Sequence, residues 1–168
     1  REFCSKSWNN RVNVTADTQN DILKIAVIER HKASGNIGLG FVKGFGLKTG
    51  AIASTIAHDS HNMIVIGTND DDMYYAANQL VKSQGGKIIV ENGKTLAQLK
   101  LPIAGLMSEE PAEIVMEKLQ TLEKTASDIG CKINDPFMSM AFLSLSVIPE
   151  INWRWQIWSH KFIWINLS

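Results

Sequence analysis

The dipeptide Asn92-Gly93, set between two short apolar runs, most constrains how this chain can fold. Residues 87–90 precede it and residues 95–101 follow it. Asparagine and glycine tolerate the positive φ angles that a two-residue hairpin turn requires. The pattern therefore predicts an antiparallel hairpin, which argues against a purely parallel sheet.

Other short apolar runs have the length and composition of buried strands. Four of them precede the hairpin, at residues 22–28, 37–42, 51–57 and 63–67. A fifth, at residues 137–148, follows Asp135-Pro136, and we expect it to be a strand or a mixture of strand and turn.

Helical spacing of apolar residues appears in two places. In the first helix residues 69–72 offer caps and negative charge at the start, and Gly85-Gly86 ends it. Its apolar positions are Met73, Ala76, Ala77, Leu80 and Val81.

A second helix is predicted to start at Ser108-Glu109-Glu110-Pro111, which combines a capping residue, two acidic residues and a first-turn proline. Its apolar face comprises Val115, Leu119, Leu122, Ala126 and Ile129. Together with the strands, this predicts an α/β fold leaning towards α+β, in which a mixed sheet with one hairpin packs against at least two helices.

Composition limits the classes of partner and the compartment. The 168 residues contain 17 basic and 17 acidic side chains, so the overall charge gives no reason to expect nucleic acid or an anionic membrane. No run reaches the ~18 apolar residues of a membrane span, and the N-terminus lacks the apolar core of a secretory signal. The two cysteines suit a reducing compartment, and we expect the cytoplasm. The chain starts with Arg1 rather than Met, as expected of a fragment or a processed product.

The glycine-rich stretch from Gly38 to Gly46 invites comparison with nucleotide-binding loops. Its glycines are spaced GxGxxxGxG and precede another predicted strand, so they match neither the dinucleotide fingerprint nor the P-loop. A glycine-bearing strand and turn packed against a neighbour is the better interpretation.

Two polar segments are candidates for a site. His58, Asp59, Ser60, His61 and Asn62 lie between two predicted strands, where paired imidazoles beside a carboxylate could transfer protons, hold a substrate or contribute to a metal site. One loop offers too few ligands for a complete metal centre. An ordinary loop that satisfies its own backbone fits these residue types equally well.

The second candidate segment contains Glu29, Arg30 and His31, at the end of the first strand, where ligands often bind in open α/β sheets. Of these we single out Glu29 and His31. The run Asp70-Asp71-Asp72 looks like a cation site, but compensation of a helix dipole explains it more simply.

Seven stretches, in order and with similar spacing, resemble the C-terminal domain of bacterial adenine deaminases. They occupy residues 21–31, 35–48, 50–54, 57–62, 66–70, 101–108 and 135–138. The resemblance runs from about Asp21 to Pro149. It implies three segments, namely an irregular arm or interdomain linker at 1–20, the deaminase-like domain at 21–150, and an atypical tryptophan-rich tail at 151–168.

The resemblance also implies an activity for the complete family enzyme, which belongs to the amidohydrolase group and hydrolyses adenine to hypoxanthine and ammonia in purine metabolism. There a Mn or Fe ion in a (β/α)8 barrel activates the attacking water. Such a barrel takes ~200 residues of its own. We therefore expect this chain alone to hold no metal or other cofactor, to contain no catalytic residues and to be inactive as an isolated fragment.

The expected partners are that barrel and, in the complete enzyme, adenine. The five residues 58–62, with Glu29 and His31, are then candidates to face the barrel or shape the substrate pocket. Two alternatives stay open, which are a stand-alone module that binds a small molecule or a protein, and an inactive truncated product. The sequence leaves the oligomeric state open.

Overall fold

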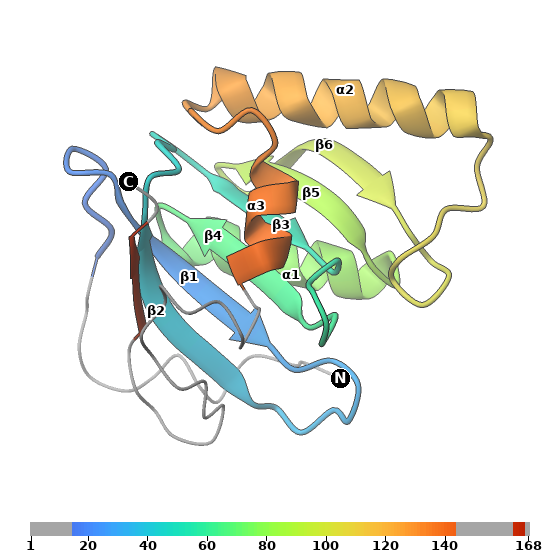
Figure 1. Cartoon of the computed structure of the whole chain (residues 1–168), viewed down its shortest axis with the longest axis horizontal. Helices are drawn as coiled ribbons and strands as arrows, with labels where there is room; N and C mark the ends of the chain where they lie inside the picture. Colours follow the sequence, from blue (N-terminus) through green and yellow to red (C-terminus); the bar gives the residue numbers. More distant parts are fainter. Residues whose placement is uncertain (1–14, 144–162, 167–168) are drawn as a thin grey trace.

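A single twisted sheet organises the computed structural model, which describes residues 15–143 and 163–166. Its strand order is β6-β5-β3-β4-β1-β2-β7, and every neighbouring pair is antiparallel except β2 and β7. The predicted mixed sheet is therefore confirmed (Figure 1). The strands are β1 Ile22–Ile28, β2 Ile37–Lys43, β3 Ala51–Ser54, β4 Met63–Gly67, β5 Gly86–Glu91, β6 Lys94–Lys100 and β7 Ile163–Asn166.

Helices cover both faces of this sheet. Helix α1 (Asp70–Lys82) packs on one face, while α2 (Ala112–Asp128) and α3 (Pro136–Leu143) lie on the other (Figure 1). Side chains alternate between the two cores because successive residues of a strand point to opposite faces. In β1, Leu23 and Ile25 enter the α2–α3 core, whereas Ala26 and Ile28 enter the α1 core.

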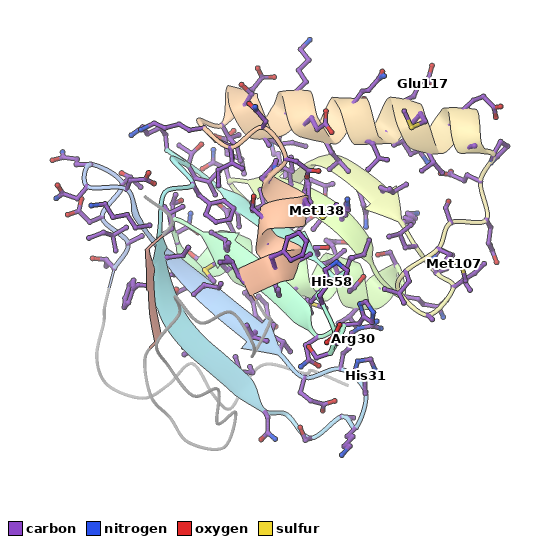
Figure 2. The ribbon with its side chains drawn as sticks, in the orientation of Figure 1. Arg30, His31, His58, Met107, Glu117 and Met138 are labelled. Carbon is purple, nitrogen blue, oxygen red and sulfur yellow. The ribbon has the colours of Figure 1, made fainter. Side chains whose placement is uncertain are left out.

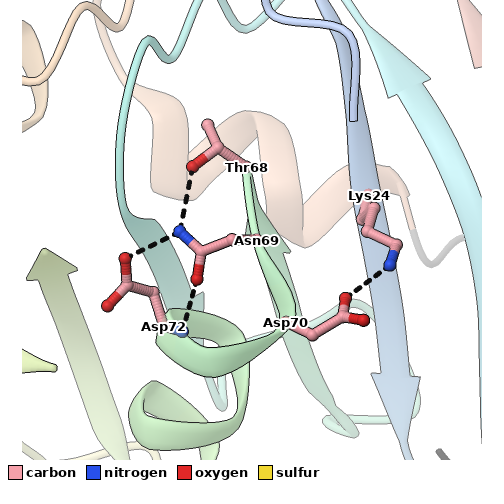
Figure 3. Close-up of polar contacts among 5 residues, drawn as sticks. All are labelled: Lys24, Thr68, Asn69, Asp70 and Asp72. Carbon is pink, nitrogen blue, oxygen red and sulfur yellow. Dashed lines mark hydrogen bonds and ion pairs between the residues drawn. The ribbon is translucent and has the colours of Figure 1, made fainter. Parts of the chain in front are cut away.

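The predicted hairpin and first helix are confirmed. Asn92 and Gly93 both have positive φ, of 51° and 69°, between β5 and β6. Asn69 caps α1 by accepting a hydrogen bond from the Asp72 backbone N–H at 2.8 Å (Figure 3). Asp72, which is buried, also accepts from the Gly93 N–H at 2.7 Å, so the helix start holds the hairpin turn.

The start of α2 differs from its prediction. Pro111 is the capping residue and makes no side-chain hydrogen bond to the helix. The Ser108 hydroxyl instead accepts from the Glu110 N–H at 3.1 Å, too early in the chain to reach the helix. The predicted Ser108 cap is wrong, although Leu122 and Ala126 are buried on the apolar face as expected.

The segment after Asp135 is a helix, so the prediction of a strand or a mixture of strand and turn is wrong for residues 137–143. The Asp135 side chain accepts from the Met138 N–H at 2.9 Å, and Pro136 occupies the first turn. These are helix-start signals. Periodicity failed because this short helix is apolar on most sides, as a buried strand would be. Residues 144–148 lie outside the described residues.

The strand predicted at 51–57 ends earlier, at Ser54. The Ser54 hydroxyl accepts from the Ile56 N–H at 3.0 Å, and Thr55 turns to other partners, so the ladder stops there. In the described part of the chain, no helix is long and apolar enough to cross a membrane.

The glycine-rich stretch forms β2 and the turn after it, as the packed-strand interpretation predicted. Gly46 has a φ of 80°, and its N–H donates to the Asp21 carboxylate at 2.6 Å. A Cβ at Gly46 would lie 2.6 Å from Cγ of Lys132. The glycines therefore allow close packing of the chain.

The two ends of the sheet carry different connections. At the end that we call the loop end, β1, β3 and β6 finish, and residues 29–36, 55–62 and 101–111 lie there. At the opposite end, the turn end, residues 44–50, 68–69 and 92–93 join the strands.

Candidate functional site

Both polar segments singled out in the sequence meet at the loop end. Strand β1 ends beside the start of β4, where Ile28 pairs with Met63, and Ser54 of β3 pairs with Ile64 on the other side of β4. The residues after β1 and the loop between β3 and β4 are therefore neighbours. The structure thus brings together segments that are about thirty residues apart in sequence.

The two imidazoles of the 58–62 loop form a tilted pair. Their ring centroids are 6.3 Å apart, with planes inclined by 56°. The His58 ring lies 5.2 Å from the Phe142 ring of α3. The backbone N–H of His58 donates to the Ala141 carbonyl at 3.0 Å. Nδ1 of His61 accepts from the Ala57 N–H at 3.4 Å. The loop is thus tied to α3 on one side and to its own backbone on the other.

His31 joins the two segments directly. Its Nε2 lies 2.7 Å from the Ser60 carbonyl, a hydrogen bond in which the ring nitrogen donates. The imidazole of His31 is therefore oriented by the 58–62 loop, although its residue is exposed.

Glu29 faces its own loop rather than the histidines. Its carboxylate accepts from the N–H groups of His31, Lys32 and Ser34 and from the Ser34 hydroxyl, at 2.5 to 3.1 Å. These bonds, that of Lys32 above all, lower the pKa of Glu29 to about 2. Its contacts therefore shape residues 29–34.

Arg30 belongs to the second candidate segment but is not singled out there, and the structure shows that it organises the loop end. Its Nε donates to the His61 carbonyl at 2.5 Å, and its Nη2 donates to the Ala104 carbonyl at 2.8 Å. The acceptors lie 31 and 74 positions further along the chain, so no local pattern could identify them. Burial lowers the pKa of Arg30, yet such a guanidinium stays charged.

The turn after β6 is fitted closely around this arginine. A Cβ at Gly105 would lie 2.8 Å from Nη1 of Arg30. The hydroxyl of buried Thr55 donates to the Gly105 carbonyl at 2.6 Å and accepts from the Gly86 N–H at 2.8 Å. The 55–62 loop and the 101–107 turn thus form one unit with Arg30.

Asn62, in the same loop, has a side-chain oxygen without a hydrogen-bond partner among the described residues. The residue is 6% exposed, and within residues 15–143 and 163–166 its Oδ1 has no hydrogen-bond partner. A buried acceptor without a partner is costly. Asp59 and Ser60, by contrast, are exposed at the tip of the loop.

The described residues contain no suitable set of metal ligands, because no group of three or more His, Cys, Asp or Glu side chains comes together among them. The acidic run at the start of α1 has structural partners, because Asp70 pairs with Lys24 and Asp72 holds the hairpin turn (Figure 3). The loop end offers imidazoles, an amide oxygen and a guanidinium. Those groups can orient or hydrogen-bond a partner but do not form a metal centre by themselves.

Figure 2 shows Met138, His58, Arg30 and His31 following one another down the viewed side of the molecule, with Met107 beside them. The candidate residues thus share one side with α3 and with the turn after β6.

Comparison with known proteins gives a consistent match. The family model described as the adenine deaminase C-terminal domain matches residues 4–154, which includes most of the segment before Asp21. Adenine deaminase of Desulforamulus reducens is 48% identical over 151 residues, which are 89% of this chain and 26% of that protein. Adenine deaminase of Brucella anthropi is 52% identical over 138 residues, and adenine deaminase 1 of Rhizobium etli is 54% identical over 137; each match covers 82% of this chain and 24% of the relative.

Proposed function

This chain belongs to the family of adenine deaminase C-terminal domains, and we propose that it works as that part of an enzyme that hydrolyses adenine to hypoxanthine and ammonia. One observation carries the proposal: the chain matches named adenine deaminases at about 50% identity over most of its length, yet spans only about a quarter of theirs. The remaining three quarters have ample room for a catalytic barrel.

In the complete enzyme the barrel would hold the metal, Mn or Fe, which would supply a water activated for attack on the ring carbon that bears the amino group. The described residues of this chain do not assemble a metal-ligand set, so we assign them no step of that chemistry. The complete enzyme would act in purine metabolism in the cytoplasm.

The contribution of this chain is to position groups at the loop end. We assign a position facing the opening of the barrel to three residues of the loop end, namely His58, His61 and Asn62. His31 lies beside them. The contacts of Arg30 with the His61 and Ala104 carbonyls support this assignment, because they hold the loop in one arrangement before a partner arrives. Preorganised polar groups bind better than groups that must first be ordered. Glu29 shapes the adjoining loop through its backbone contacts.

The test is ammonia release from adenine. We would assay three proteins: this chain, the D. reducens deaminase without the segment that matches it, and a chimera that joins that truncated deaminase to residues 1–168. We expect no turnover by the chain alone and restored turnover by the chimera. Adenine hydrolysis by the chain alone, with a stoichiometric metal, would contradict the proposal.

The role of the loop is tested in the same chimera. We expect His58→Ala and His61→Ala each to lower kcat/KM at least tenfold. Asp71→Asn, an exposed polar change near the turn end, is the control and should leave kcat/KM unchanged. If both histidine variants match the control, the loop has a structural role only.

A further inference from the structure

Three of the six methionines are exposed, and two of these lie on α2 and α3. Met107, Met116 and Met138 are 58%, 55% and 48% exposed, and Phe142 is 43% exposed. They come from the turn after β6, from α2 and from α3. We call these four residues the methionine face.

Specific contacts connect the turn after β6 to α3. The ring of Phe142 lies 5.2 Å from that of His58, and Arg30 links the carbonyl of His61 to that of Ala104. Met107 lies just beyond Ala104, in the turn closed by hydrogen bonds between Ile103 and Met107. The candidate site therefore runs between two parts of the methionine face, and Figure 2 shows Met107, Met138 and His58 on one side of the molecule.

On α2, Met116 shares a flank with Glu123, and Lys87 lies between Glu123 and α3. Glu123 follows Met116 by about two helical turns, so the two share a flank. Burial lowers the pKa of Lys87, whereas the negative charges of Asp135 and Glu123 raise it. Glu123 is therefore near this lysine. Nζ of Lys87 in turn lies 5.3 Å from the ring centroid of Phe137 in α3.

These side chains have the character of a docking surface. Methionine is flexible and polarisable, so it adapts to an irregular partner surface. Apolar side chains grouped on one face and bordered by polar residues mark interaction sites. Arg30 lies beside the turn that carries Met107, through its bond to the Ala104 carbonyl, and Glu110 lies beside α2, through its ion pair with Lys118.

The identity of the occupant follows from chain length. This chain spans 24–26% of its relatives, so about three times its length of polypeptide is joined to the matching segment in those proteins. We propose that the catalytic barrel of the complete deaminase docks on the methionine face. This inference rests on the proposed function and adds the surface to it.

Methionine oxidation tests the inference without measuring activity. Peroxide converts exposed methionines to sulfoxides, and mass spectrometry gives the rate at each site. In the 168-residue chain alone, Met107, Met116 and Met138 should react fast, while Met73 and Met140, which are 2% and 0% exposed, should react slowly. In the chimera we expect the three exposed methionines to react at least tenfold more slowly. Equal rates in the two proteins would overturn the inference.

A second copy of this chain is the competing occupant. Protection that already occurs in the chain alone, and that grows with its concentration, would assign the face to self-association and overturn the barrel as its occupant.

A matched pair of variants gives an independent test. Met138→Glu places a charge on the face, whereas Val81→Glu places one on α1, where the side chain is 52% exposed on the other side of the sheet. In the chimera, Met138→Glu should restore fast oxidation at Met107 and Met116, and Val81→Glu should not. Circular dichroism and thermal melts establish that both variants are folded. Continued protection in Met138→Glu would contradict the docking surface.

The two proposals fail separately. A chimera that hydrolyses adenine while its three methionines stay reactive refutes the docking face and leaves the function standing. A chimera with protected methionines but no turnover refutes the function and leaves the face as an interface.

Discussion

At the turn end of the sheet, backbone hydrogen bonds and carboxylates such as Asp21 and Asp72 hold the turns. At the loop end, by contrast, the side chains of Arg30 and Thr55 reach across to the carbonyls of distant loops. Lys48 and Lys132 at the turn end donate their backbone N–H groups to the carbonyls of Ile129 and Phe45, at 2.9 and 2.8 Å. Gly50, with a φ of 72°, packs directly on the carbonyl of Val90. These contacts leave little freedom in the backbone.

The loop end depends on a few long side chains. Arg30 and Thr55 hold the 55–62 loop and the 101–107 turn, and Glu29 holds residues 31–34. The tip of the 55–62 loop at Asp59 and Ser60 is exposed, although Gly85 and Gly86 at the loop end are packed as closely as Gly50. The comparison teaches that a change at a closely packed glycine such as Gly50 should affect global stability, whereas a change in the side chains that hold the loops should affect local order and function.

The largest effect is expected for Gly50→Ala at the turn end. The new Cβ would lie 2.2 Å from the Val90 carbonyl oxygen, and the residue would keep a left-handed φ. We expect a loss of roughly 3 kcal/mol or more in the free energy of unfolding, from conformational strain and steric overlap together. Urea denaturation measures it.

Gly93→Ala is the matched control for Gly50→Ala. Gly93 also has a positive φ, but nothing lies within 4 Å of the position that a Cβ would take there. It should lose only about 1 kcal/mol, from the backbone conformation alone. Equal losses at the two glycines would show that close packing at Gly50 does not contribute.

A smaller effect on stability is expected for Arg30→Met at the loop end. Losing both hydrogen bonds of a half-exposed guanidinium should cost about 1 kcal/mol. Hydrogen exchange should accelerate in segments 58–62 and 103–107 and stay unchanged in β3 and β5. Arg30→Lys keeps the charge but not the two-pronged geometry. If lysine preserved the slow exchange, charge rather than bridging would explain the order.

The smallest and most local effect concerns Glu29. Its folded pKa of about 2 lies below the ordinary value of 4.5, so its stabilisation of the loop is fully present above about pH 4.5. It is lost as the pH falls towards 2. Carbon NMR of the Glu29 carboxyl, followed with the amide signals of His31 and Lys32, measures this titration. Glu29→Gln should remove the pH dependence of those amides, and a carboxyl that titrates near 4.5 would contradict the contacts described.

Local patterns predicted much of the sheet correctly because their causes are local. The Asn92-Gly93 turn, the Asn69 cap and the alternation of Leu23 and Ile25 with neighbours on the other face depend on residues a few positions apart. The loop containing His58 and His61 could also be located, since it separates two apolar runs. The sequence did not predict that this loop meets His31, because that contact exists only once β1 has paired with β4.

Failures of the sequence prediction occurred where several local structures were compatible with the same residues. Residues 137–143 are apolar enough for a buried strand or a buried helix, and packing against β3 and the rest of the α2–α3 core decided for the helix. Ser108 has the chemistry of a cap, but the helix starts beyond its reach at Ala112.

The sequence by itself determined the hairpin, the two long helices, the packed glycine-rich strand and the family of this chain. Only the tertiary structure decided that Arg30 joins the 58–62 loop to the turn after β6, and that Met107 and Met138 lie on the same side of the molecule as His58. The physical reason is the separation in sequence between the residues that interact. Turns and caps are set by backbone angles of adjacent residues, whereas a side-chain contact across 74 positions exists only once the strands between them have paired.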